Sequence, residues 1–180
     1  MGRTFNVSQR KAPYANITFK QNLYVAANQA VVTTTAALAT TYTGLCVSNP
    51  ATNTKKLVLL EFGWGQHAAA AAGNIGIMGG AISAAMAVSA AAAIVPKNMY
   101  MGSANASVAI VDDGCTIATP VLYKVFGSTG SVATTGYGTH PLTMVDLKGS
   151  IIVPPGYFVA SYISVITTSA LAFYFAWEEV

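Results

Sequence analysis

Residues 157–180 read YFVASYISVITTSALAFYFAWEEV, and this stretch decides the fold. Large and small side chains alternate along both halves of it, with a Thr-Thr-Ser break at 167–169. Because alternate residues of a strand face opposite sides, the stretch predicts two strands of a hairpin, packed between two layers. The second strand carries bulky side chains on one face and mostly small ones on the other: Leu171, Phe173, Phe175 and Trp177 against Ala170, Ala172, Tyr174 and Ala176. The bulky face is predicted to be core in a monomer, with a subunit interface near a threefold axis as the alternative.

The chain from residue 23 onward reads as further short strands separated by turns. β-Branched and aromatic residues favour strands, and Gly, Pro, Asn and Asp mark the breaks between them. The strands are expected at residues 31–35, 40–47, 57–62, 107–111, 120–126 and 146–153. Those at 40–47 and 57–62 are predicted to form a hairpin, and the one at 107–111 to end at a turn, Asp112-Asp113-Gly114. The pattern predicts an all-β fold over residues 23–180, an antiparallel jelly-roll-like β-sandwich.

An alanine-rich middle, residues 63–106, allows two interpretations. Alanine is the best helix former, so a helix over 82–94 is one of them. Gly73-Asn74 and Gly79-Gly80 instead mark turns between short strands. We favour strands at 74–79 and 84–90.

Composition limits the class of protein. Hydrophobic residues make up 53% of the chain and charged residues 8%, with a formal net charge of +3. Such a composition disfavours disorder, and so few charges poorly cover the surface of a free monomer. The uncharged stretches at 62–96 and 149–177 are interrupted by polar residues and by Pro154-Pro155, so no membrane span is expected, and neither is a secretory signal. We therefore expect the surface to be covered by further copies of the chain or by a scaffold.

Residues 1–22 are predicted to form an extended N-terminal arm. Its charged residues are all basic, Arg3, Arg10, Lys11 and Lys20, and the first acidic residue of the chain is Glu61. The arm is predicted to lie across the acidic rim of a neighbouring protein. Contact with phosphates is the alternative, although no motif for sequence-specific nucleic-acid recognition is present.

The residues that carry catalysis in other proteins are few and scattered. His67 and His140 have no acid or cysteine nearby, and Cys46 and Cys115 lack metal-ligand spacing, so each cysteine is predicted to be a small buried residue rather than half of a disulfide. The paired acids, Asp112-Asp113 and Glu178-Glu179, are adjacent residues, which point to opposite faces of a strand. We expect no enzyme activity, no cofactor and no metal.

Two segments carry a resemblance to a known group of proteins. The ending GSIIVPPGYFV at 149–159, followed by Trp177-Glu178-Glu179, resembles small virion proteins of tailed bacteriophages, and the segments 42–50 and 55–60 are similar to the first hairpin of that group. The resemblance implies a jelly-roll protein that decorates a capsid, often as a trimer. The pattern is also similar to trimeric tumour-necrosis-factor-like sandwiches, which share the architecture without the function.

The function expected from these observations is that of a capsid decoration or cement protein in the virion. Its expected partners are further copies of itself, as a homotrimer, and the major capsid protein or another virion protein. The alternative is a trimeric surface module that binds a carbohydrate or a receptor. Its stacking platforms would be the tyrosines beside glycine-rich loops: Tyr100, Tyr123, Tyr137 and Tyr157.

Overall fold

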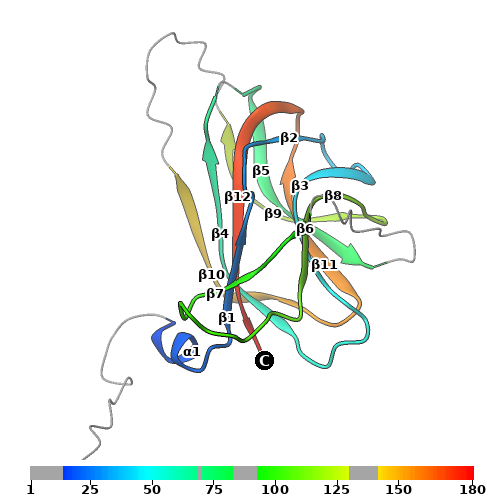
Figure 1. Ribbon diagram of the computed structural model, residues 1–180. Coiled ribbons are helices and arrows are strands. Elements are labelled where there is room, and N and C mark those ends of the chain that lie inside the picture. Colours follow the sequence, from blue (N-terminus) through cyan, green and yellow to red (C-terminus); the bar gives the residue numbers. More distant parts are fainter. Residues whose placement is uncertain (1–13, 69, 83–92, 130–141) are drawn as a thin grey trace, which may run out of the picture.

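The computed structural model describes residues 14–68, 70–82, 93–129 and 142–180 (Figure 1). Two antiparallel sheets pack face to face and make a β-sandwich, as the alternating sequence predicts. The order of the strands is that of a jelly roll, because most consecutive strands cross from one sheet to the other. The predicted fold class is confirmed.

Sheet A has the order β10-β4-β12-β1-β7, with β2 paired to one end of β12. Its strands are β1 (Leu23–Ala27), β2 (Val32–Thr34), β4 (Leu57–Gln66), β7 (Lys97–Asn98), β10 (Thr143–Val153) and β12 (Thr167–Glu179). Sheet B has the order β6-β8-β3-β11-β5-β9. Its strands are β3 (Thr41–Asn49), β5 (Gly73–Ala81), β6 (Ala93–Ile94), β8 (Ile110–Thr116), β9 (Val121–Thr129) and β11 (Tyr157–Ile163). A short helix, α1 (Ala15–Phe19), precedes the first strand.

The two predicted hairpins are wrong in their pairing. β11 pairs with β3 and β5 in sheet B, whereas β12 pairs with β1, β2 and β4 in sheet A. β3 and β4 likewise belong to different sheets. The physical reason is that alternation specifies which side chains face the core but not which strand lies alongside. Sequence neighbours here face each other across the core.

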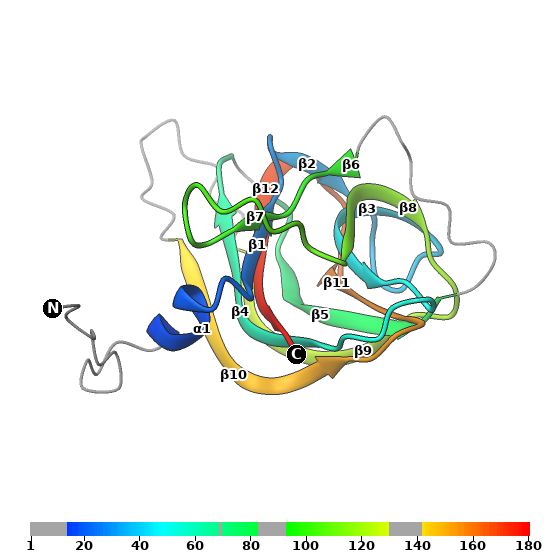
Figure 2. The ribbon, with the colours of Figure 1, turned by 60° about the horizontal axis from the view of Figure 1, so that its bottom comes forward.

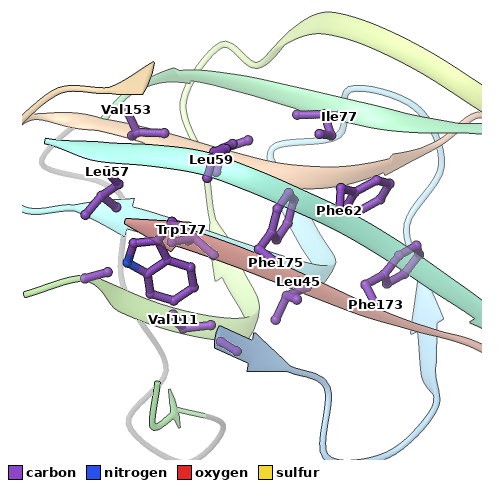
Figure 3. Close-up of a cluster of buried hydrophobic side chains, with 14 of the residues drawn as sticks. Leu45, Leu57, Leu59, Phe62, Ile77, Val111, Val153, Phe173, Phe175 and Trp177 are labelled. Carbon is purple, nitrogen blue, oxygen red and sulfur yellow. The ribbon is translucent and has the colours of Figure 1, made fainter. Parts of the chain in front are cut away.

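The main core lies between the sheets and combines aliphatic side chains with a group of aromatic rings (Figure 3). Leu171, Phe173, Phe175 and Trp177 project from β12 into it and are almost completely buried. The ring centroid of Phe62 lies 5.7 Å from Trp64, 5.8 Å from Phe126, 6.2 Å from Phe173 and 4.9 Å from Phe175. The structure thus places the bulky face of β12 inside one subunit.

A second buried cluster lies on the other face of sheet B. On β3, Leu45 and Val47 belong to the main core and Cys46 to the second cluster, and on β5 Ile77 and Met78 divide in the same way. Neighbouring strand residues point to opposite faces, so sheet B is buried on both sides. The second cluster consists of Tyr42, Cys46, Met78, Cys115, Ile117, Phe158 and Ala160.

Two further predictions meet the structure in the middle of the chain. The strand expected at 74–79 is confirmed by β5, while the one expected at 84–90 lies outside the described residues. Asp112-Asp113-Gly114 is not a turn, because it continues β8. The register with β3 shifts there, and the extra residue lies on β3, where Gly44 and Leu45 oppose Asp113, so β8 runs opposite a β-bulge of its partner strand.

Candidate docking surface

One edge strand of sheet B, β9, and one edge strand of sheet A, β10, lie on the same side of the sandwich (Figure 2). β9 follows closely along β5, because a methyl group at Gly76 would lie 2.1 Å from the carbonyl oxygen of Lys124. The Nζ of Lys124 donates a hydrogen bond of 3.1 Å to Ser150 Oγ on β10. Each of the two strands has a strand neighbour on one side only among the described elements, which leaves backbone donors and acceptors open along the other.

Apolar side chains gather on this side of the molecule. β9 exposes residues on both of its faces, and β10 and β11 add one each at the adjoining end. These exposed side chains are Val121, Leu122, Tyr123, Val125, Ile152 and Tyr157, and we call them the β9–β10 surface. With aromatic side chains covering about 150–250 Å² and aliphatic ones somewhat less, they expose roughly 500 Å² together. Exposed apolar side chains gathered along one edge make this side of the sandwich a candidate interaction surface.

A pocket of about 200 Å³ opens within the β9–β10 surface. Tyr123 from β9 and Tyr157 from β11 both line it. The remaining lining is almost entirely apolar: Gly79, Ile151, Ile152, Val153, Pro154, Phe158 and Val159. Such a lining fits an apolar group that approaches between two tyrosine rings.

Among the tyrosines predicted as stacking platforms, the structure brings only Tyr123 and Tyr157 together. Tyr100 is exposed near α1, where its ring centroid lies 6.5 Å from that of Phe19. Tyr137 lies outside the described residues.

Of the predicted arm residues, the structure describes only Lys20, which is exposed at the end of α1; Arg3, Arg10 and Lys11 lie outside the described residues. The last part of the arm is not extended, because residues 15–19 form a helical turn held by the hydrogen bond from Thr18 N to Tyr14 O. It is fixed to the sandwich: Tyr14 Oη donates to Asp146 Oδ1 over 2.7 Å, and Asn98 Nδ2 donates to Gln21 O over 2.7 Å.

The Tyr14–Asp146 contact gives a test of this attachment. The hydrogen bond from Tyr14 is the main cause that lowers the pKa of Asp146, and burial followed by the same bond raises the pKa of Tyr14 to about 12. A carboxyl with a lowered pKa in the folded state stabilises at pH values above its ordinary pKa of about 3.9, and the contribution is lost as the pH falls through the lowered value. We expect Tyr14→Phe to return the pKa of Asp146 toward its ordinary value, measured by NMR titration of the side-chain carboxyl carbon. An unchanged titration curve would contradict the contact.

The cysteines and the histidine that the structure describes do not form a catalytic arrangement. Cys46 and Cys115 are free and buried, as predicted. A hydrogen bond with Cys115, together with burial, raises the pKa of the Cys46 thiol well above its usual range, so the thiol stays neutral. His67 is exposed at the end of β4, and His140 lies outside the described residues. Over residues 14–68, 70–82, 93–129 and 142–180 no three His, Cys, Asp or Glu side chains are grouped to hold a metal ion.

One carboxylate of each acidic pair is buried and accepts hydrogen bonds. Glu179 is buried and accepts hydrogen bonds from Ser107 Oγ at 2.5 Å and from Val108 N at 2.9 Å, with Lys55 Nζ 3.4 Å away. Asp112 is also buried, and its Oδ1 accepts a hydrogen bond from Gly114 N at 2.9 Å within β8, opposite the bulge of β3. Glu179 therefore joins the end of β12 to the chain before β8, whereas the bond of Asp112 stays within β8.

No helix in the part of the chain that the structure describes is long and apolar enough to span a bilayer. Comparison with known proteins adds no relative: no protein-family model, no curated protein and no solved structure matches this chain.

Proposed function

We propose that this chain is a non-enzymatic structural protein of a virion. It assembles with copies of itself, as a homotrimer, and decorates and strengthens the shell. The observation that carries the proposal is the β9–β10 surface, where six apolar side chains and a pocket lie exposed on one edge of a well-packed sandwich. Because only 8% of the residues are charged, electrostatic repulsion between copies is weak and does not prevent such surfaces from associating.

The size of the surface fits a subunit contact. Roughly 500 Å² of apolar area from one copy, met by a similar area from another, gives on the order of 1,000 Å², the lower bound of specific protein interfaces. A decoration protein repeats such contacts many times on a lattice, so modest individual affinities combine into firm attachment.

The first experiment measures the mass of the native protein by light scattering over a range of concentrations. We expect the wild-type protein to have a mass that is a multiple of 18.6 kDa. The variant Val121→Asp should be a monomer, because Val121 is 60% exposed in the β9–β10 surface and the substitution places a charge there. Ile166→Asp is the matched control, since Ile166 is 62% exposed but lies in the β11–β12 turn. A wild-type monomer at all concentrations would refute the proposal.

The second experiment tests the shell as partner. The proposed contact of the arm with an acidic capsid surface predicts that a variant with Arg3, Arg10 and Lys11 changed to Glu disappears from purified virions while its own oligomer stays intact. Residues 14–22 are left unchanged because they pack on the sandwich. Lys148→Glu, a charge reversal on β10, serves as control. Retention of the triple variant on virions, measured by mass spectrometry, would contradict the role of the arm.

A second candidate function rests on the pocket itself. Tyr123 and Tyr157 line one cavity, which supports a surface module that binds a ligand between two aromatic rings. A glycan array decides between the two functions. Reproducible binding that is lost in Tyr157→Ala would favour the binding module, and an array without binding would count against it.

A further inference from the structure

A second group of exposed apolar side chains lies beside β7. Met101 is 93% exposed, more than any other large apolar residue in the described part of the chain. Its neighbours Met99 and Tyr100 are also exposed, as are Val95 before β7 and Phe19 on α1. We call these five residues the Met101 surface: Phe19, Val95, Met99, Tyr100 and Met101. By the same estimate as above, they expose roughly 500 Å².

The residues that follow β7, 99–103, form what we call the Met101 loop, and hydrogen bonds brace it. Met99 N donates to Leu23 O at 2.9 Å, which continues the pairing of β7 with β1. Tyr100 N donates to Asn98 Oδ1 at 2.8 Å, and Ser103 N donates to Tyr100 O at 3.0 Å, so Met101 lies in a closed turn. A projecting side chain on a braced turn loses little conformational freedom when it binds, which favours affinity.

The pocket lined by Tyr123 and Tyr157 and the exposed side chain of Met101 lie at opposite edges of sheet A. β10, which lines the pocket, is one edge of sheet A, and β7, which carries the Met101 loop, is the other (Figure 2). One chain therefore cannot fill its own pocket with its own Met101. If two copies paired through their β9–β10 surfaces, the pocket of one would face the pocket of the other, and neither would be filled.

We propose that the Met101 loop of one copy inserts into the Tyr123–Tyr157 pocket of the next, so that the subunits join head to tail. This inference rests on the proposed self-assembly and names the partner of the β9–β10 surface. A methionine side chain is flexible and its sulfur packs favourably against aromatic rings, such as those of Tyr123 and Tyr157. The two surfaces together supply on the order of 1,000 Å², the area that a specific interface needs. Head-to-tail contacts close into a ring when the rotation between subunits allows it, as a trimer requires.

The test uses two variants, each lacking one half of the contact. Met101→Asp removes the projection and Tyr123→Asp removes the pocket, and circular dichroism with thermal melting checks that both fold. We expect each variant alone to be monomeric. Mixed in equal amounts, they should form a species of twice the 18.6 kDa chain mass and nothing larger, because only one contact is then intact.

The outcomes separate the inference from the proposed function. A wild-type protein that stays monomeric refutes both. A wild-type oligomer that Tyr123→Asp disrupts and Met101→Asp does not would keep the β9–β10 surface as an interface and overturn the Met101 loop as its partner. A mixture of the two variants that remains monomeric, or that regains the full wild-type mass, also overturns the head-to-tail arrangement. Ile166→Asp, outside both surfaces, should keep the wild-type mass throughout.

Discussion

Phe62→Ala is expected to lower the free energy of unfolding by about 3–5 kcal/mol, the loss measured for large aromatic side chains in well-packed cores. Phe62 is completely buried and touches the aromatic rings of four other residues, from β4, β9 and β12. Its removal leaves a cavity in the middle of the sandwich, between strands of both sheets. Urea unfolding followed by the fluorescence of Trp64 and Trp177 measures the loss.

Ile166→Ala is the control for this prediction. Ile166 is exposed in a turn, so its truncation should change stability by no more than about 0.5 kcal/mol. If Phe62→Ala unfolds within 1 kcal/mol of the wild type, the packing of the aromatic core described above is wrong.

Glu179→Ala is expected to cost about 3 kcal/mol, because it leaves the half-buried hydroxyl of Ser107 and the N–H of Val108 without their acceptor. The lost ion pair with Lys55 adds little to this loss of stability, since the Lys55 side chain is 43% exposed and is hydrated by water when the carboxylate is removed. Glu179→Gln keeps an acceptor oxygen in place and should cost clearly less. Chemical denaturation of the three proteins measures the difference. Equal losses in the two variants would show that charge, rather than hydrogen bonding, dominates at this position.

The sequence predicts the buried faces well and the strand partners poorly. The alternation in 170–177 identifies the four bulky side chains of β12 that face sheet B, because burial follows directly from a period of two. The same pattern contains no information on whether β12 pairs with β11 or with β1. That choice depends on how the whole chain crosses between the sheets, as the β3–β4 connection also shows.

The candidate site lies where sequence patterns are least informative. Residues 120–126 read PVLYKVF, an apolar run that suits a buried strand, yet β9 is an exposed edge. An apolar run reports a strand without reporting its place in the sheet. The sequence feature that could have indicated where β9 lies is the pair Gly76 and Gly79 on β5. Glycines on this neighbouring strand allow Lys124 and Tyr123 of β9 to approach closely. Asp112-Asp113-Gly114 fails as a turn for a related reason, because residues typical of turns also occur within a strand that lies opposite a β-bulge.

The pairing of β1 with β12 has a consequence for how the protein is made. Tyr24 pairs with Trp177, so the first strand of sheet A meets β12 only when parts of the chain that lie far apart in the sequence come together. Until β12 is in place, the apolar stretch of β4 lacks one strand neighbour, so sheet A closes late in folding. Chains that lack β12 would leave the edges of β1 and β4 unpaired, and we expect them to be substrates for chaperones and proteases.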